Sequence, residues 1–398
     1  MKYVIVQGDG MGDRPDPAHG GTTPLQAAHT PHLDRLAGLG EFGLIHTIPQ
    51  GYPPGSDVGN LSLFGYDPAR YYTGRSPLEA AAMGVKLGPA DISFRMNMVT
   101  IAPDGAMDDY SAGHIDSADA AALVETISES LADETFQFYP GVSYRHLLVW
   151  RKGLEAMTTT PPHDITGQAA APHLPSGPGA DQLLRIMEAS RTLFADHPIN
   201  RKRSAAGEKP VSQVWLWGQG RAPQMDPFTK LYGLKGACIS AVDLVRGVAV
   251  NAGFRIVHVP GATGFLDTDY AAKGRYALDS LATDDLIFVH VEAPDEAGHM
   301  GNREEKIRAI ESIDREIIGP LLEGLPALGE YKLMVASDHA TPVQLRTHTP
   351  DPVPYVMVSN RRMRGDRAPV KYCEAEAART GIALVHGHEA IRHLLDFC

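Results

Sequence analysis

Carboxylates and imidazoles follow the apolar runs of this sequence at positions where they could bind divalent metal ions. Asp338 and His339 come shortly after the apolar run Leu333–Ala336, and His348 follows nine residues later. A carboxylate beside an imidazole at the end of a buried strand suits a divalent cation better than it suits an apolar core. A strand end, however, often carries an aspartate for turn geometry, and a single histidine is more often a surface or core residue. This stretch therefore needs partners elsewhere in the chain.

Two further strand ends supply such partners. Asp9 follows the predicted strand Tyr3–Gln7 in a glycine-rich turn, although a plain Asp-Gly turn would also explain it. The predicted buried strand Leu286–Val291 is followed by Asp295 and His299, which are four residues apart. One helical turn would place these two side chains on the same side. In an open α/β sheet, ligands gather at the carboxyl ends of the strands, where at least three of these groups are expected.

Ser56 is the candidate nucleophile. It follows Pro53-Pro54-Gly55 and precedes an apolar stretch, so a tight loop could present it at the N-terminus of a helix. Backbone N–H groups and the helix dipole favour an oxyanion or a phosphate at such a position. The simpler alternative is that Ser56 only caps this helix, and the two roles are compatible.

Together these residues are numerous enough to bind two metal ions. One ion could be bound by three of them: Asp295, His299 and His348. The other could be bound by the remaining four: Asp9, Asp338, His339 and the hydroxyl of Ser56. Mixed carboxylate and imidazole sets suit Mn or Zn better than Ca, and Mg less well. Two ions ~4 Å apart can clamp the attacking and leaving oxygens of a phosphoryl transfer, and a serine held by one of them would become a usable nucleophile.

The elements that must position these residues are typical of an α/β fold. Strands alternate with helices, which indicates a doubly wound, mostly parallel sheet with helices on both faces. Besides the strands above, Pro354–Val358 is expected as a strand. The expected helices include one that starts at Thr30, followed by Val242–Val250, Asp269–Leu281, Arg303–Leu325 and Ala390–Leu395.

Between residues 89 and 230 the pattern changes to that of an inserted, smaller α+β domain. Residues 1–88 and 231–398 are then the metal-binding catalytic domain. Within the insert, Ile92–Ile101 alternates as a half-exposed strand and Arg201–Pro210 is expected to be a loop. Arginine makes bidentate contacts to phosphate and carboxylate, so the polar groups beside the insert's strands would suit a small phosphorylated acid, although each alone is typical of a surface. These candidates are Arg95, Arg145, His146, His163, Asp164 and Arg221.

The length, charge and composition of the chain limit the classes of partner that it could bind. The 398 residues suggest about two to three domains. The formal net charge is −12 and no basic tract stands out, which argues against nucleic acid. No apolar stretch reaches the ~18 residues of a membrane span, and the N-terminal apolar run is too short for a signal peptide. Cys238, Cys373 and Cys398 are odd in number and far apart, which indicates free thiols in a reducing compartment, most simply the cytoplasm. No feature indicates an oligomeric state.

Short motifs spread over essentially the whole chain carry a resemblance to a known family. They are Asp9-Gly-Met-Gly-Asp13, Pro54-Gly-Ser-Asp57, Gly74-Arg-Ser-Pro-Leu-Glu79, Tyr144-Arg-His-Leu-Leu148, Pro162-His-Asp164, Trp215-Leu-Trp-Gly-Gln-Gly220, Pro294-Asp-Glu-Ala-Gly-His299, Ser337-Asp-His339 and His348-Thr349. In these motifs the sequence resembles the archaeal-type, cofactor-independent phosphoglycerate mutases of the alkaline phosphatase superfamily. The metal residues alone would identify only the superfamily, whereas the motifs of the insert narrow the resemblance to this branch.

The resemblance implies an alkaline-phosphatase-like fold, the same assignment of residues to two metal ions, with Mn favoured over Zn, Co or Mg, and transient phosphorylation of Ser56. It also implies that the insert binds the glycerate part and closes over the catalytic domain. The implied activity is interconversion of 3-phosphoglycerate and 2-phosphoglycerate, in glycolysis or gluconeogenesis, without a bisphosphoglycerate cofactor. The alternatives are a related phosphotransferase such as a homoserine kinase, a phosphomonoesterase, and a non-catalytic metal-binding or scaffold protein. The metal site does not separate the enzymes, because substrate choice lies in the insert.

Overall fold

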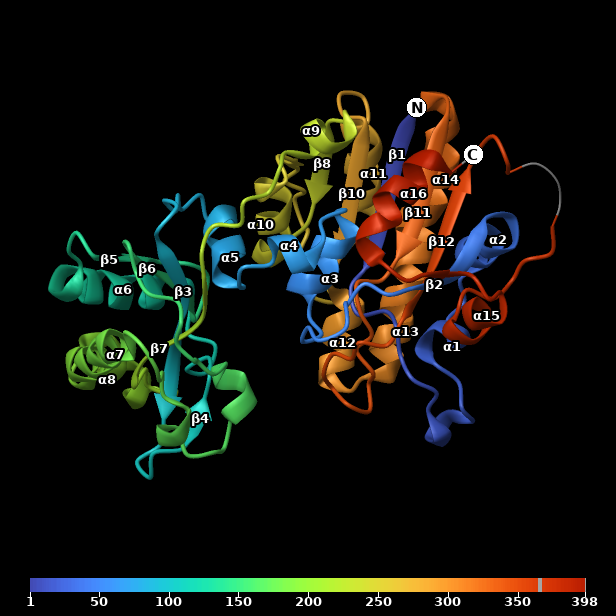
Figure 1. The fold of residues 1–398 in the computed structure, drawn as a ribbon. Helices are drawn as coiled ribbons and strands as arrows, with labels where there is room; N and C mark the ends of the chain where they lie inside the picture. The colour runs from blue at the N-terminus through green and yellow to red at the C-terminus, as the bar shows by residue number, and fades with distance from the viewer. Residues whose placement is uncertain (364–366, 398) are drawn as a thin grey trace. The chain divides into compact units, whose positions relative to one another are not determined.

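The computed structural model describes residues 1–363 and 367–397, and the chain divides into two compact units (Figure 1). The first unit contains Met1–Tyr72 and Gln224–Cys398, and the second contains Thr73–Pro223. The boundaries expected from the sequence were 89 and 230, so the helix α5 (Ser76–Ala82) falls in the second unit. Cys238 and Cys373 are free thiols, as expected, whereas Cys398 lies outside the described residues.

The first unit is built on a mostly parallel sheet with the strand order β13-β2-β12-β11-β1-β10-β8-β9. Its strands are β1 (Lys2–Gly8), β2 (Glu41–Ile45), β8 (Gly236–Ile239), β9 (Arg255–Ile256), β10 (Leu286–Val291), β11 (Tyr331–Ala336), β12 (Val353–Ser359) and β13 (Ala383–Leu384). The central strand β1 pairs in parallel with both β10 and β11. Only β12 is antiparallel to its neighbours β11 and β2 within this described sheet. The mostly parallel α/β fold predicted from the sequence is confirmed.

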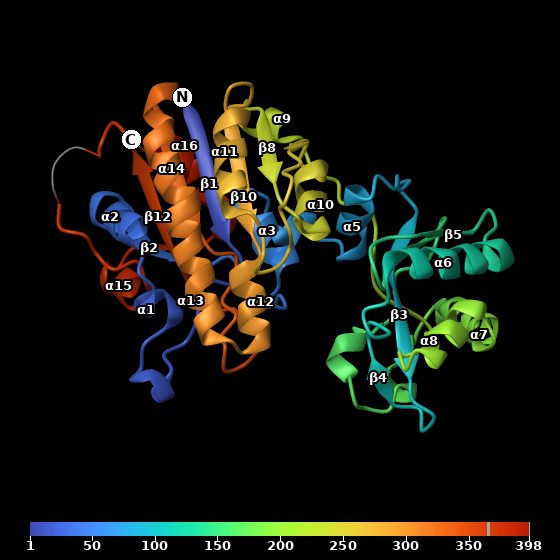
Figure 2. The ribbon, with the colours of Figure 1, turned by 180° about the vertical axis from the view of Figure 1, so that it is seen from behind.

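Helices cover both faces of this sheet (Figures 1 and 2). One face carries α2 (Pro31–Leu39), α11 (Tyr270–Ser280), α13 (Arg303–Ser312) and α14 (Gly319–Gly324), which lie in front of the sheet in Figure 2. The other carries α3 (Ser56–Leu63), α10 (Asp243–Asn251) and α16 (Ala390–Asp396). Shorter helices are α1 (Pro24–Ala27), α4 (Pro68–Tyr71), α9 (Phe228–Tyr232), α12 (Ala293–Met300) and α15 (Glu374–Arg379). Alternate residues of β1, such as Val4 and Val6, are completely buried against the α2 face, as a strand covered on both sides requires.

The helix expected over Arg303–Leu325 is nearly continuous but changes its winding in the middle. A π-helical turn, Ile313–Ile318, joins α13 to α14. Within it, the buried carboxylate of Asp314 accepts hydrogen bonds from the backbone N–H groups of Leu33, at 2.7 Å, and His32, at 3.2 Å. These bonds satisfy donors at the start of α2, which has no side-chain cap of its own.

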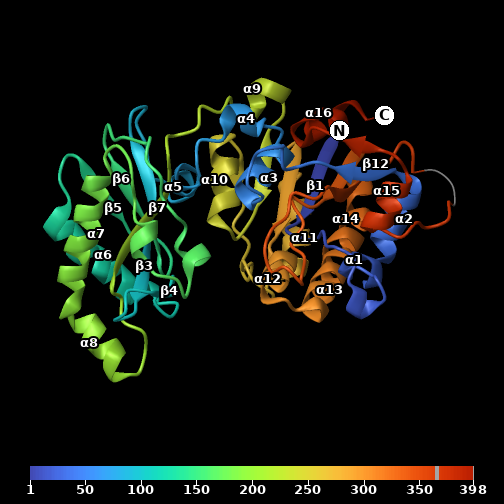
Figure 3. The same cartoon turned by 60° about the horizontal axis from the view of Figure 1, so that its bottom comes forward.

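The second unit is a smaller antiparallel sheet with helices on one face, in keeping with the expected α+β pattern. Its strands are β3 (Ile92–Ile101), β4 (Met107–Asp109), β5 (Phe136–Tyr139), β6 (Arg145–Trp150) and β7 (Gln213–Gly220). β3 pairs with both β6 and β7, and β5 pairs with β6. The helices α6 (Ser117–Leu131) and α7 (Ala180–Ala195) pack along one face (Figures 1 and 3).

The expected loop at Arg201–Pro210 is wrong for its first half, because α8 spans Pro198–Ala205. Pro198 is well suited to the first helical turn, and the ring of His197 accepts a hydrogen bond from the N–H of Ile199. Arg203 is buried and donates to the carbonyls of Ala112 and Lys209. These long-range contacts stabilise a helix that the polar local sequence does not predict.

The two ends of the second unit lie against each other. The hydroxyl of Thr73 donates to the carbonyl oxygen of Arg221 at 2.7 Å. A Cβ atom on Gly74 would lie 2.2 Å from the carbonyl oxygen of Gln219, and Gly74 has a φ of 122°, so this position requires glycine. A Cβ atom on Gly220 would lie 1.9 Å from the carbonyl oxygen of Thr73. We refer to residues 73–74 and 219–221 as the neck of the second unit.

In the described ranges, 1–363 and 367–397, none of the helices has the length and apolar composition needed to cross a membrane.

Candidate metal centre

One group of candidate metal-binding side chains forms beyond the carboxyl end of β10. The helix α12 begins two residues after this strand, with Pro294 in its first turn. One turn of α12 brings His299 Nε2 to 3.1 Å from Asp295 Oδ2, as the spacing predicted. His348 joins them from the loop after β11, with its Nε2 at 3.5 Å from Asp295 Oδ1 and 2.9 Å from His299 Nε2.

Hydrogen bonding determines which nitrogen of His299 faces this group. Its Nδ1–H donates to the carbonyl oxygen of Arg346 at 3.0 Å, and Arg346 has a φ of 56°. The lone pair of His299 Nε2 therefore points toward His348 and Asp295. Burial opposes protonation, but the carboxylate of Asp295 raises the pKa of His299 to about 9. The group thus attracts positive charge, whether a proton or a divalent cation.

A second group forms where β1 and β11 end. His339 Nε2 lies 3.4 Å from Asp9 Oδ1, 3.3 Å from Asp338 Oδ2 and 3.2 Å from the hydroxyl oxygen of Ser56. The side chains of Asp9, Asp338 and His339 are completely buried. The ligand atoms of these three residues lie within 4.8 Å of one another.

Thr341 connects the two groups. Its hydroxyl donates to Asp295 Oδ1 and lies 3.2 Å from His339 Nδ1. A hydroxyl has only one proton, so Thr341 must accept the Nδ1–H of His339. The lone pair of His339 Nε2 then points toward Asp9, Asp338 and Ser56, as a metal ligand requires.

The two carboxylates of the second group lie in a setting that suits a cation. Asp338 is held by the N–H of Gly10, at 3.2 Å, and by the side-chain amide of Asn60, at 3.1 Å. Burial and nearby Asp338 raise the pKa of Asp9 well above its usual value, and burial and nearby Asp295 raise the pKa of Asp338 to about 7. Oδ1 of Asp9 is buried without a hydrogen-bond donor. The residues present therefore fit a divalent cation, which would compensate both charges.

Ser56 is the first residue of α3, and Gly55 occupies the cap position. The Ser56 hydroxyl does not cap the helix, because it lies 3.2 Å from His339 Nε2, while Asp57 accepts the N–H of Val58 at 2.9 Å. A Cβ atom on Gly59 would lie 2.5 Å from the carbonyl oxygen of Asp338, so glycine here permits the close approach of α3 to the end of β11. The hydroxyl is thus presented to the second group and is not used for helix capping.

The sequence reasoning missed two residues of this centre. His290 lies inside β10, and its Nε2 is 2.8 Å from Asp9 Oδ2 and 3.3 Å from Glu292 Oε2. Asp9, His290 and Glu292 form a third set of possible ligands. The signal was present, since His290 is the polar residue in the apolar run Leu286–Val291.

In the second unit, Arg95 and Arg145 lie on the same face of the antiparallel sheet. The register pairs Asn97 with Arg145, and side chains two residues apart share a face. Arg95 is buried, with its Nε 2.8 Å from Glu79 Oε2 and its guanidinium 4.4 Å from the ring centre of Trp217. Arg145 is exposed, and its guanidinium lies 4.6 Å from the ring centre of Tyr144.

The other substrate candidates are more scattered. The ring of His163 lies 5.3 Å from that of Trp217, so it joins the Arg95 face, and its neighbour Asp164 is exposed. His146 points to the opposite, helix-covered face, where its Nδ1 accepts the N–H of Gly141 at 3.0 Å and burial lowers its pKa to about 4. Arg221, in the neck, pairs with Glu155 at 2.9 Å.

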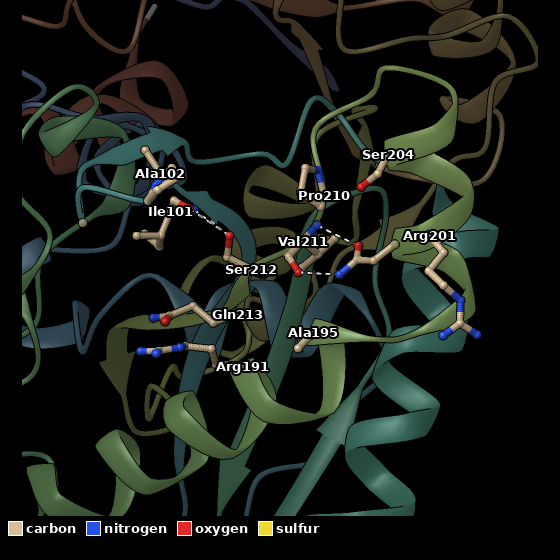
Figure 4. Close-up of a pocket in the computed structure, with 13 residues that line it drawn as sticks. Ile101, Ala102, Arg191, Ala195, Arg201, Ser204, Pro210, Val211, Ser212 and Gln213 are labelled. Carbon is tan, nitrogen blue, oxygen red and sulfur yellow. Dashed lines mark hydrogen bonds between the residues drawn. The ribbon is translucent and has the colours of Figure 1, made fainter.

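A hollow of about 690 Å³ in the second unit contains none of these candidates (Figure 4). It lies beside the end of β3, and Arg191 and Arg201 line it. The side chain of Asn200 in its wall is buried, but it bonds to the backbone of Phe194 and Val211. Nothing in this hollow directs an unsatisfied buried group at a ligand.

Comparisons with known proteins identify relatives of this chain. A family model described as 2,3-bisphosphoglycerate-independent phosphoglycerate mutase matches residues 37–200, and one described as type I phosphodiesterase / nucleotide pyrophosphatase matches residues 246–352. A probable 2,3-bisphosphoglycerate-independent phosphoglycerate mutase from Geobacter sulfurreducens is 50% identical, with 100% of each chain covered. A 2,3-bisphosphoglycerate-independent phosphoglycerate mutase from Methanothrix thermoacetophila is 49% identical over 99% of this chain and 100% of that protein.

Solved structures show the same relationship. The PH0037 protein from Pyrococcus horikoshii matches with a TM-score of 0.82 and 28% identity, over 99% of this chain and 96% of that one. The cofactor-independent phosphoglycerate mutase from Thermoplasma acidophilum matches with a TM-score of 0.65 and 27% identity, over 100% and 99% of the two chains. The resemblance seen in the sequence motifs is thereby confirmed: the chain belongs to the 2,3-bisphosphoglycerate-independent phosphoglycerate mutase family.

Proposed function

We propose that this chain interconverts 3-phosphoglycerate and 2-phosphoglycerate through a phosphoserine at Ser56, without a bisphosphoglycerate cofactor. The observation that carries the proposal is the position of the Ser56 hydroxyl, 3.2 Å from His339 Nε2 and beside two sets of convergent ligand atoms. Relatives of the same length that carry the mutase name support the choice of reaction.

The candidate ligands divide between two divalent cations. One cation would be held by three residues: Asp295, His299 and His348. The other would be held by Asp9, Asp338, His339 and the Ser56 hydroxyl. When bound, the ions would neutralise the phosphoryl oxygens and lower the pKa of the serine hydroxyl. Mixed carboxylate and imidazole ligands favour Mn, with Zn, Co and Mg as alternatives.

The chain's own groups then account for the transfer. Ser56 Oγ gives up its proton and forms a bond to phosphorus as the bond from phosphorus to the glycerate oxygen breaks, and that oxygen takes up a proton. The N-terminus of α3 favours the added negative charge. The other glycerate hydroxyl then attacks the phosphoserine and gives up its proton, which restores the Ser56 hydroxyl. Water must be excluded in between, because hydrolysis of the phosphoserine would release phosphate.

We place recognition of the glycerate carboxylate in the second unit, on the face that carries Arg95 and Arg145. Arg145 is the candidate for direct contact, since it is exposed on β6. Arg95 is the candidate for a supporting role, since it is buried between Glu79 and Trp217. We also place the protein in the cytoplasm, in keeping with the free thiols of Cys238 and Cys373.

The nucleophile is tested by comparing Ser56→Ala with Ser62→Ala. Ser62 lies in the same helix, but its hydroxyl donates to the carbonyl oxygen of Thr47 at 2.6 Å. Formation of 2-phosphoglycerate is followed with enolase as the coupling enzyme, and acid quenching traps the phosphorylated protein. Ser56→Ala should abolish both turnover and trapped phosphate while metal binding persists, whereas Ser62→Ala should retain both. Near-normal mutase activity in Ser56→Ala would refute the assignment.

The reaction itself is tested on the wild-type protein. After chelation, activity should disappear and return on addition of Mn, with Zn, Co and Mg compared in parallel. Phosphate released without mutase activity would indicate a phosphomonoesterase. ADP formed from ATP and homoserine would indicate a phosphotransferase with another substrate.

A further inference from the structure

We propose that His290 is a positioning residue that orients Asp9, so that one chosen oxygen of that carboxylate faces the second cation. The inference rests on the proposed two-cation site. His290, on β10, pairs with Gln7 of β1, and Gln7 precedes Asp9 by two residues. Its Nε2 is 2.8 Å from Asp9 Oδ2, and both side chains are completely buried.

The neighbours of the imidazole ring indicate which nitrogen of His290 carries the proton. The Ser240 hydroxyl oxygen accepts the N–H of Val242 at 3.0 Å and lies 3.1 Å from His290 Nδ1. A hydroxyl can donate to Nδ1 or accept from it, and Ser240 Oγ also lies 3.4 Å from the carbonyl oxygen of Val242. The carboxylate of Asp9 decides between the two arrangements, because Oδ2, 2.8 Å from Nε2, can only accept when it is ionised. The ring proton is then on Nε2, where it can be donated to Asp9 Oδ2.

The backbone fixes both residues of the pair. The ammonium of Lys273, which is buried in α11, donates to the carbonyl oxygen of His290 at 3.0 Å. The N–H of Asp9 donates to the carbonyl oxygen of Val291 at 2.9 Å, which extends the ladder between β1 and β10. These bonds fix the backbone positions from which the two side chains extend.

The consequence concerns the two oxygens of Asp9. Oδ2 is occupied by His290, whereas Oδ1 has no hydrogen-bond donor and lies 3.4 Å from His339 Nε2, on the side of the second group. A carboxylate held in this way offers one oxygen in one direction. Removal of the hydrogen-bond partner of a metal ligand typically weakens metal binding by about 10- to 100-fold.

The same contacts admit one rival interpretation. Asp9, His290 and Glu292 have ligand atoms within 4.8 Å of one another, so they could hold a third cation. His290 Nε2 would then present a lone pair, and Nδ1–H would donate to Ser240. The two interpretations differ in the tautomer of His290 and in the number of cations bound.

The test compares His290→Gln with His290→Leu in the full chain. Glutamine can place an amide N–H near the position of Nε2, whereas leucine cannot donate. Binding of Mn²⁺ to the metal-free proteins is followed by electron paramagnetic resonance of the free ion. We expect two bound ions in the wild type, both retained within about threefold in His290→Gln, and one of them bound about 10- to 100-fold more weakly in His290→Leu.

Nitrogen-15 NMR of metal-free wild-type protein supplies a readout that does not depend on cations. The proton of His290 should be on Nε2. If His290→Leu does not fold, Ser240→Ala takes its place, because it leaves the ring but removes the bond to Nδ1, and the same ion should bind about 2- to 10-fold more weakly.

Three outcomes would overturn the inference about His290. They are unchanged affinities in the leucine variant, a proton on Nδ1, or a third bound ion that disappears in His290→Gln. A wild-type protein that binds no Mn²⁺ would instead refute the two-cation proposal, so the two failures can be told apart.

Discussion

Replacing Thr341 by valine should weaken binding of the cation held by His339, although Thr341 is not among the proposed ligands. The Thr341 hydroxyl donates to Asp295 and accepts the Nδ1–H of His339, and both Thr341 and His339 are completely buried. In the valine variant, a proton on Nδ1 would have no acceptor, so it moves to Nε2, where Asp9 and Asp338 lie within reach. Cation binding must then reverse this change of tautomer.

The cost of that reversal is that of an unsatisfied buried donor, about 1–3 kcal/mol. This corresponds to about 5- to 150-fold weaker binding. Isothermal titration of the metal-free protein with Mn²⁺ measures the affinity, and nitrogen-15 NMR reports the tautomer of His339. Thr341→Ser is the matched control, since it keeps the hydroxyl and should keep both values. Unchanged affinity in Thr341→Val, or a proton on His339 Nδ1 in that variant, would refute the reasoning.

Three further predictions concern protons and buried charge. Because burial raises the pKa of Asp338 to about 7, protons compete below that pH with the cation that Asp338 would bind, and the apparent Mn²⁺ affinity of that site should fall about tenfold from pH 8 to pH 6. Equal affinity of this site at pH 6 and pH 8 would contradict the prediction. Lys306→Met should lower the free energy of unfolding, measured in urea titrations, by about 3–5 kcal/mol, because the buried ammonium donates to Asp13 Oδ2 at 2.9 Å and to two carbonyl oxygens. A loss below about 1 kcal/mol would show that this network is dispensable. Burial lowers the pKa of His146 from 6.5 to about 4, so between these pH values the unfolded state binds a proton that the folded state does not. The free energy of unfolding of the second unit should therefore fall by up to about 3 kcal/mol as the pH drops from 6.5 to 4, and His146→Gln should lack this dependence.

The sequence was sufficient to propose the candidate metal centre because the candidate ligands follow recognisable elements. Asp9, Asp295 and Asp338 each come just after an apolar run, and parallel strands bring their carboxyl ends to one edge of the sheet. The spacing of Asp295 and His299 predicted one helical turn, and α12 provides it. The fold class followed from the same alternation of strands and helices.

Contacts between distant segments could not be predicted in this way. Thr341 and Arg346 each fix a histidine tautomer, and Ser240 contacts the ring of His290, but nothing local distinguishes them from ordinary loop residues. His290 lies inside a buried strand, where an isolated histidine is usually a core residue. The helix α8 was missed because Arg203 is satisfied by partners on distant segments, such as Ala112. Thr341 and His339 are only two residues apart, but the hydroxyl of Thr341 is oriented by its bond to the distant Asp295, and the other deciding hydrogen bonds also join distant segments.

The neck of the second unit has a consequence for how this architecture can evolve. Its chain enters and leaves at one place, since Thr73 and Arg221 are joined by a hydrogen bond and Gly74 and Gly220 permit close backbone approach. The sheet of the first unit takes no strand from residues 73–223. An exchange of this segment for another with adjoining ends would therefore leave the register of the ligand-bearing strands unchanged. If substrate recognition lies in the second unit and cation binding in the first, as proposed, the two properties can evolve separately.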